Sequence, residues 1–166
     1  MSRSFASLLC AAILLGACFP RDQNLTESGK GKPVVTADVP ATVAPGSTTE
    51  LAVEVANPGP GDIDAVLVAF VVVGIGGQQG NAVPLVPPGR NDDSPSVGTV
   101  EPRPEGVGEG GTIYRFGPLD TGESRTFRFE IIVPDAPGTY ANSLQVYDGA
   151  DPQRIDGLRL QIEVSS

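Results

Sequence analysis

Apolar and polar residues alternate at every second position in segment after segment of this sequence, from Pro33 to its end. Segments 48–56 and 126–133 show the pattern most clearly. Their alternating apolar residues are Leu51, Val53, Val55, Phe127, Phe129, Ile131 and Val133. Because successive side chains of a strand point to opposite faces, this period predicts β-strands with one buried face. No segment in this region has a convincing helical period, so we expect an all-β fold.

Turn-forming residues separate these segments. The chain holds 21 Gly and 16 Pro, and most of them lie between the apolar runs, where they favour turns over disorder. The predicted strands are residues 34–39, 48–56, 65–73, 112–116, 126–133, 140–147 and 158–164. Two sheets that each have one apolar face can bury those faces only against each other. We therefore predict an immunoglobulin-like antiparallel β-sandwich of about seven strands over residues 33–166.

One predicted strand, Ala65–Val73 (AVLVAFVVV), is apolar at every position. It is much shorter than the roughly 20 residues of a membrane-spanning helix, and its β-branched residues indicate a central strand. Such a strand needs cover on both faces. The outer cover is the long loop that follows, a partner or a membrane surface, and we favour cover from within the chain.

Residues Gly74–Gly111 are the irregular part of the sequence, and they are rich in Gly and Pro. Within them, segments 83–86 and 97–100 are apolar enough to form short strand pairings. A loop of this length is uncommon in a compact domain and is often functional or mobile. We therefore interpret this part as a long Gly/Pro-rich insertion that distinguishes the chain from other sandwiches.

The first 17 residues are typical of a bacterial lipoprotein signal peptide. Arg3 supplies the positive charge, and residues 5–15 form an apolar stretch that is too short to span a bilayer. A lipobox then follows in register, formed by Leu15, Gly16, Ala17 and Cys18. The alternative is an ordinary signal peptide in which the cysteine is accidental. Cys10 has no such motif before it and is interpreted as part of the apolar stretch.

The lipobox predicts that residues 1–17 are removed and that Cys18 is linked to diacylglycerol. One acyl chain binds a bilayer marginally, whereas two or more hold a protein there stably. Residues 18–32 are polar and lack periodicity, so we expect the lipidated cysteine to be followed by a flexible tether. The domain is then expected in the cell envelope, outside the cytoplasm. By resemblance to Gram-negative sorting, Phe19 after the cysteine favours the outer membrane if the cell is Gram-negative.

The composition excludes several functions. The chain has no His, and its only cysteines are Cys10 and Cys18. The mature chain therefore has no disulfide, no Cys/His metal cluster, no Ser-His-Asp triad and no Cys nucleophile. A formal net charge of −9 repels phosphate backbones, so we expect no nucleic-acid partner. Carboxylate-pair glycosidase chemistry stays open on composition alone, but we expect no enzyme and no cofactor.

Acidic residues in predicted loops are weak candidates for a metal site. Asp148, Asp151 and Asp156 form one group, and Asn91–Asp93 form another. Ca²⁺ prefers oxygen ligands of this kind, but neither group has the spacing of an EF-hand loop. Asp and Asn are also ordinary turn formers. We therefore interpret both groups as solvated turn residues.

Other polar residues have a structural interpretation beside a functional one. Asp62 and Asp64 lie on one face of a strand and resemble a carboxylate pair, but we expect exposed residues at the entry to an apolar strand. Tyr140 is expected to bond nearby backbone as in a tyrosine corner, and the alternative is an aromatic that stacks on a ligand. Asn142 is expected to satisfy a buried backbone group near the same corner.

Three stretches together resemble a known family. They are residues 44–66, with an Asn-x-Gly-Pro turn, residues 116–134, with a Gly-x-Leu-x-x-Gly-Glu turn, and residues 136–152. Their order is similar to that in a surface-protein repeat domain of unknown function and in the cell-adhesion-related (CARDB-like) domains, which have immunoglobulin-like folds. The apolar strand 65–73, the long insertion and the single copy depart from the family pattern.

The resemblance transfers no catalytic residues and implies a structural or adhesive module at the cell surface. We therefore expect a non-enzymatic, envelope-anchored lipoprotein that acts as a structural or protein-interaction module. Its expected partners are the lipid bilayer, through acylated Cys18, and an envelope or surface protein. The alternative is a ligand-binding or Ca²⁺-dependent surface module.

Overall fold

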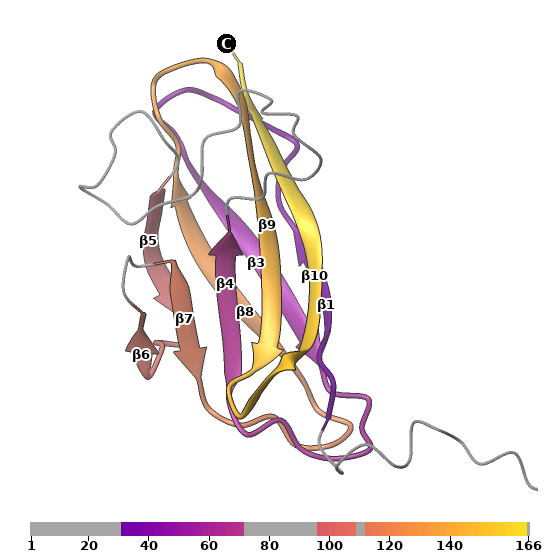
Figure 1. The fold of residues 1–166 in the computed structure, drawn as a ribbon. Coiled ribbons are helices and arrows are strands. Elements are labelled where there is room, and N and C mark those ends of the chain that lie inside the picture. Colours follow the sequence, from indigo (N-terminus) through magenta and orange to yellow (C-terminus); the bar gives the residue numbers. More distant parts are fainter. Residues whose placement is uncertain (1–30, 72–95, 109–111, 166) are drawn as a thin grey trace, which may run out of the picture.

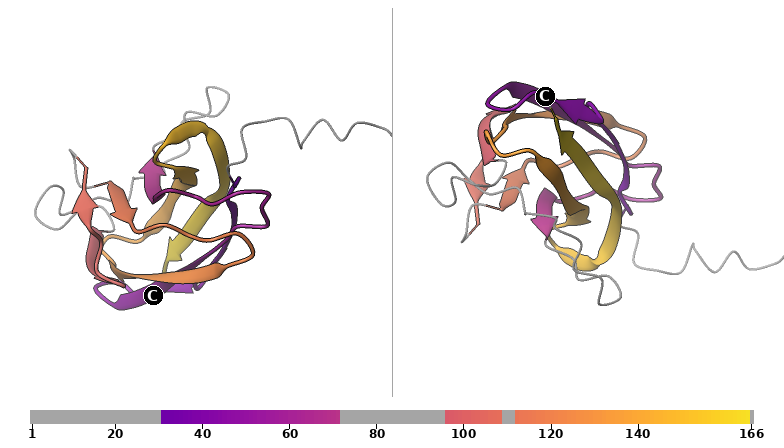
Figure 2. Two further views of the ribbon diagram at one scale, coloured as in Figure 1. Left: turned by 90° about the horizontal axis from the view of Figure 1, so that it is seen from below. Right: turned by 90° about the horizontal axis from the view of Figure 1, so that it is seen from above.

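The computed structural model describes residues 31–71, 96–108 and 112–165. In these ranges the chain forms ten strands in two packed sheets, which Figure 1 shows from the side and Figure 2 from both ends. The strands are β1 (Val34–Asp38), β2 (Thr42–Val43), β3 (Thr48–Ala56), β4 (Val66–Val71), β5 (Ser96–Glu101), β6 (Gly106–Val107), β7 (Ile113–Phe116), β8 (Ser124–Ile132), β9 (Gly138–Asp148) and β10 (Asp151–Val164). The described residues include no helix that could cross a membrane. The all-β prediction is confirmed.

The order of the strands defines an immunoglobulin-like sandwich. One sheet has the order β1-β3-β8-β5 and the other β2-β10-β9-β4-β7-β6. In the immunoglobulin fold, one sheet holds strands A, B, E and D, and the other holds C, F and G. The first sheet here has the A-B-E-D order, and β4, β9 and β10 occupy the positions of C, F and G. The predicted fold class is therefore confirmed, with β6 and β7 extending the second sheet beyond strand C.

The N-terminal part of the domain contributes to both sheets. β1 pairs antiparallel with β3, and after Pro40 the chain crosses to pair as β2 with the end of β10. The pairing of β2 with β10 is parallel, so the second sheet is mixed, whereas the prediction was purely antiparallel. A two-residue strand gives no alternating pattern, which is why the sequence did not indicate it.

The predicted insertion Gly74–Gly111 is partly regular. β5 pairs with β8 and β6 pairs with β7, so this part is not one irregular loop. The predicted pairing at 97–100 is confirmed, whereas segment 83–86 lies outside the described residues. The β5 register shifts between Val97 and Val100, and both residues pack inward although they are three positions apart. This bulge hides the alternation that would have indicated a strand.

The last hairpin is longer than predicted. Asp148 is the last residue of β9, Asp151 and Asp156 lie in β10, and only Gly149 and Ala150 separate the two strands. The prediction that these aspartates occupy a loop was therefore wrong. The register shifts between Asp151 and Ile155, so polar residues enter the strand before the regular alternation starts at Leu158.

The core lies between the two sheets and follows the predicted pattern. The alternating residues of β3 and β8 are at most 3% exposed. Phe129 lies at its centre, with its ring centroid 5.2 Å from that of Phe70, 5.3 Å from that of Tyr114 and 6.4 Å from that of Phe116. These edge-on contacts are favourable for aromatic rings. Burial raises the pKa of Tyr114 to about 12, so its hydroxyl stays protonated.

β4 occupies a central position in the second sheet, as its apolar sequence predicts. One face enters the core, and on the other face Ala65 and Ala69 are only 2% exposed. Ala69 lies between Ile113 of β7 and Gln145 of β9, whose longer side chains flank it. Leu67 is half-buried. The chain itself therefore covers much of the outer face of this strand, as expected.

We expect Phe129→Ala to lower the free energy of unfolding by about 3–5 kcal/mol, because it removes a fully buried ring and leaves a cavity. Chemical denaturation monitored by circular dichroism measures the change. Ile132→Ala is the matched control on the same strand, since Ile132 is 40% exposed and its loss is expected to cost much less. Equal losses for the two variants would contradict this assignment of the core.

Candidate interaction surface

The outer face of the four-stranded sheet concentrates negative charge. On β1, β3, β8 and β5 the positions that alternate with the core residues point outward. The charged residues among them are Asp38, Glu50, Glu54, Glu101, Glu130 and Arg128. Five carboxylates thus face one guanidinium. We call this surface the acidic face.

Two open hollows lie on the acidic face. The larger, of about 390 Å³, is lined by Thr48, Thr49, Glu50, Thr99, Glu101, Arg128 and Glu130. The smaller, of about 210 Å³, is lined by Thr36, Ala37, Asp38, Ala52, Glu54 and Thr126. Short Ala and Thr side chains between longer carboxylates form these depressions. The hollows suit single side chains of a partner better than an enclosed small ligand, which is usually largely buried in its pocket.

Like charges meet directly across two strands of the acidic face. Glu50 of β3 and Glu130 of β8 are register partners, and such pairs destabilise a sheet. Each carboxylate has a favourable contact on its other side. Glu50 Oε1 accepts a hydrogen bond of 2.7 Å from Arg128 Nη1, and Glu130 Oε2 accepts one of 2.9 Å from the Thr99 amide.

Glu130 also holds the bulge of β5. Its carboxylate lies so close to Gly98 that a Cβ there would come within 2.5 Å of Oε2. Hydrogen bonds from the backbone and side chain of Thr99 lower the pKa of Glu130. The bulge is therefore held by an ionised carboxylate. The sequence gives no sign of this contact because Thr99 and Glu130 are 31 positions apart.

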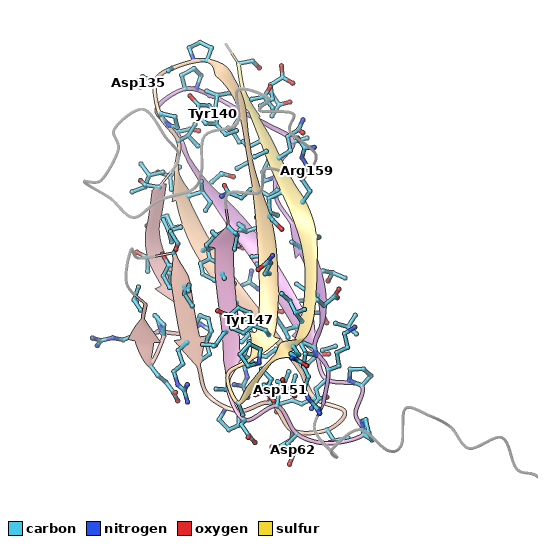
Figure 3. All side chains as sticks on the ribbon, viewed as in Figure 1. Asp62, Asp135, Tyr140, Tyr147, Asp151 and Arg159 are labelled. Atoms are coloured by element: carbon cyan, nitrogen blue, oxygen red, sulfur yellow. The ribbon has the colours of Figure 1, made fainter. Side chains whose placement is uncertain are left out.

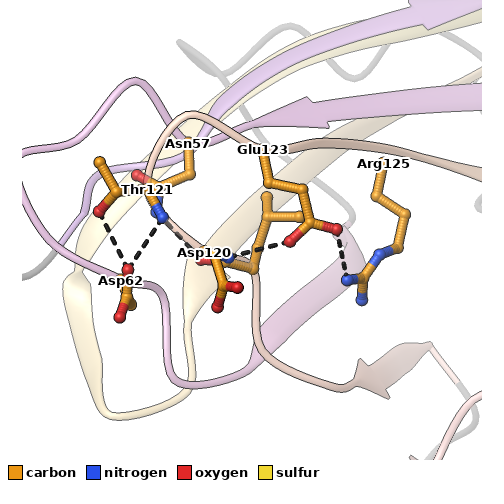
Figure 4. A network of polar contacts seen from close by, with 7 residues as sticks. Asn57, Asp62, Asp120, Thr121, Glu123 and Arg125 are labelled. Carbon is orange, nitrogen blue, oxygen red and sulfur yellow. Dashed lines mark hydrogen bonds and ion pairs between the residues drawn. The ribbon is translucent and has the colours of Figure 1, made fainter.

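A network of hydrogen bonds joins the loops at one end of the sandwich, as Figure 4 shows. Asn57 is 1% exposed, and its Nδ2 donates to the carbonyl oxygens of Gly61 (2.9 Å) and Leu119 (3.0 Å). Its Oδ1 accepts from the Gly59 amide. Gly59 has φ +93°, a conformation that glycine adopts without strain. Asn57 therefore links the loop after β3 to the loop after β7 and has a structural role.

The carboxylates around Asn57 are engaged in the same network. Asp62 Oδ1 accepts hydrogen bonds from the amide (2.9 Å) and the hydroxyl (3.0 Å) of Thr121. Glu123 accepts from the Asp120 amide and from Arg125 Nη2, and these bonds lower its pKa, the Arg125 bond being the larger cause. Figure 4 shows the contacts of Asp62 and those of Glu123.

Asp62 and Asp64 have the placement that the sequence predicted. Both are exposed, and the buried Ile63 lies between them. Ile63 forms an isolated bridge with Leu119, which fixes this entry to β4. Asp62 and Asp64 are therefore exposed residues at the entry to β4, and Asp62 is bonded to Thr121.

The weak metal candidates make separate local contacts. Asp148 is fully buried, so its interpretation as a solvated turn residue was wrong, and its Oδ1 accepts from the Ala150 amide. Asp151 pairs with Arg154 at 2.9 Å, and Asp156 Oδ2 accepts from the Val35 amide at 2.8 Å. In the described part of the chain, no group of three or more acidic, His or Cys side chains is arranged to hold a metal ion. Asn91–Asp93 and the lipobox lie outside the described residues.

Tyr140 forms the predicted tyrosine corner. Its hydroxyl donates to the carbonyl oxygen of Ala136 at 2.7 Å, and its ring is 6% exposed. Asn142, two residues further along β9, is also buried. Figure 3 shows Tyr140 and Asp135 at the end of the sandwich opposite Asp62 and Asp151, so these residues do not form one site.

The edges of the four-stranded sheet are poorly suited to pairing with another strand. The Val35 amide on edge strand β1 is taken by Asp156 of β10, and β5 is bulged. In the second sheet, β2 and β6 have only two residues each, and β2 pairs with just the last two residues of β10. Short, bulged or side-chain-capped edges are common protections against edge-to-edge pairing. In the four-stranded sheet, the outer face and the loops are therefore the surfaces most available to a partner.

No family model and no curated protein matches the sequence. Among solved structures, the chain is similar to the CARDB domain of the PF1109 protein from Pyrococcus furiosus, determined in complex with di-metal ions. The identity is 15% and the TM-score 0.46, over 86% of this chain and 97% of that one. The chain is also similar to a PapD-like domain of human CEP192 (17% identity, TM-score 0.38, over 99% and 97%). A third is a cohesin module from Clostridium perfringens (9% identity, TM-score 0.47, over 81% and 98%). The first is a domain of the family that the sequence motifs resemble.

We expect Tyr140→Phe to lower the free energy of unfolding by about 0.5–1.5 kcal/mol, because it removes only the hydrogen bond to Ala136. Tyr147→Phe is the matched control, since Tyr147 lies on the outer face of the same strand. Denaturant melts of both variants measure the difference. A variant at position 140 as stable as the wild type would show that the hydroxyl has no part in the corner.

We expect stability to fall in acid partly through Glu123 and Glu130. Their pKa values in the folded chain lie below the ordinary 4.5, so the stabilisation that they give is fully present above that pH. It is lost as the pH falls from 4.5 through the lower folded pKa values. Thermal melts between pH 6 and 3 should show a shallower dependence in the double variant Glu123→Gln/Glu130→Gln than in the wild type. Identical slopes would contradict the role of these bonds.

Proposed function

We propose that this protein is a non-enzymatic lipoprotein of the cell envelope, anchored through acylated Cys18, whose sandwich contacts another envelope or surface protein. The observation that carries the proposal is the lipobox at residues 15–18, placed immediately after a short apolar stretch. The lipid supplies the attachment, and the sandwich supplies the surface that meets the partner.

The first described residues lie at one end of the sandwich, which supports attachment of the anchor at that end. The Gly31 amide donates to the carbonyl oxygen of Asp62 at 3.1 Å, so the chain enters at the end of the sandwich that Asn57 organises. Twelve residues separate Cys18 from Gly31. At about 3.6 Å per residue they reach no further than about 45 Å. The tether is then attached to this end of the sandwich, opposite the Pro134–Gly138 turn.

The residues with the most specific contacts support a non-catalytic role. Asn57, Asp62 and Glu123 join loops, and Tyr140 closes a corner. With no His anywhere and cysteines only at positions 10 and 18, the usual nucleophile and base pairs are missing from the sequence. These four side chains thus stabilise the sandwich.

The test is metabolic labelling with a clickable palmitate analogue, followed by fractionation of the envelope. We expect label and membrane association in the wild type and in Cys10→Ala, the matched control, but neither in Cys18→Ala. Loss of two or more acyl chains removes the stable hold on the bilayer. Label that persists in Cys18→Ala, or none in the wild type, would overturn the anchor.

A further inference from the structure

The charge of the sandwich is unevenly divided between its two outer surfaces. The acidic face carries five carboxylates and one guanidinium. On the outer face of β4, β7, β9 and the regular part of β10, the charged residues are Arg115, Arg159 and Glu163. The remaining outward positions there are mostly uncharged. General acidity for solubility would not require this asymmetry between two faces of one domain.

The acidic face contains one pair of like charges in direct opposition. Glu50 and Glu130 are direct partners across β3 and β8, and the ion pair that Arg128 forms within the described residues is with Glu50. Directly opposed like charges repel, and in this pair the bonds from Arg128 and Thr99 offset the repulsion. A surface that accepts positive charge would gain from the same arrangement, because the partner's charge offsets the repulsion on contact.

The shape of the acidic face fits long side chains. Glu50, Glu101 and Glu130 surround the larger hollow, and Asp38 and Glu54 flank the smaller one. Thr hydroxyls line both. A Lys or Arg side chain can place its apolar stem over the Ala and Thr floor and its charge among the carboxylates. Because the sheet edges are bulged, capped or short, a partner contacts this sheet through its face.

We propose that the acidic face docks a protein segment rich in Lys and Arg, with cationic side chains seated in the two hollows. The inference rests on the proposed function, since it names the chemistry of the partner that the anchored sandwich contacts.

The test uses the full chain in detergent and two synthetic 12-residue peptides, one of alternating Lys and Thr and one of alternating Glu and Thr. The acidic-face variant is Asp38→Asn/Glu54→Gln/Glu101→Gln, which touches both hollows. The control variant, Glu105→Gln/Asp135→Asn/Glu163→Gln, removes the same charge away from the acidic face. Thermal melts establish that both variants are folded. Binding is measured by fluorescence anisotropy at low and at high salt.

We expect the Lys-Thr peptide to bind the wild type at low salt, to weaken as salt rises, and to lose about tenfold in affinity for the acidic-face variant. The control variant should lose less than about twofold, and the Glu-Thr peptide should not bind. Equal losses in the two variants, or no binding of the Lys-Thr peptide, would overturn the proposal. The lipid label is read in a separate assay, so failure of docking and failure of the anchor are distinguishable.

Discussion

Contact between the two apolar inner faces is the interaction on which this structure depends. The sandwich has no disulfide to join its sheets, because both cysteines precede it in the sequence. Phe129 therefore takes a central place, since its ring contacts rings from Phe70, Tyr114 and Phe116 of the opposite sheet. Such packing is strong but not directional, so it fixes the two layers without fixing the loops that join them.

Hydrogen bonds at the two ends of the sandwich are directional, and they fix the loops. Asn57 joins two loops at one end by bonds to backbone carbonyls, and Tyr140 closes the turn after β8 at the other. Both side chains are buried, so each bond is shielded from water and an orphaned partner would be costly. The polar residues with the most specific contacts are thus those that complete the fold.

The sequence predicted what depends on local alternation and missed what depends on pairing across the chain. The strands at 48–56 and 126–133 and the corner at Tyr140 follow from short patterns. β5 was predicted only as a short pairing at 97–100, because its bulge at Gly98 and Thr99, which Glu130 on another strand holds, interrupts the alternation. The acidic face was missed for the same reason, since its carboxylates are distributed over four strands and meet only when the register is known.

The acidic face belongs to a sheet whose edges restrict strand addition. Asp156 occupies the β1 edge by bonding the Val35 amide, and Glu130 ties the β5 bulge, so two carboxylates restrict strand addition. A domain that limits its edges in this way makes contact through faces and loops. One of its faces carries opposed carboxylates over open hollows, and the other carries few charges. The proposed docking of a cationic segment follows from this asymmetry, while the bonds of Asp156 and Glu130 restrict strand addition at the edges of the four-stranded sheet.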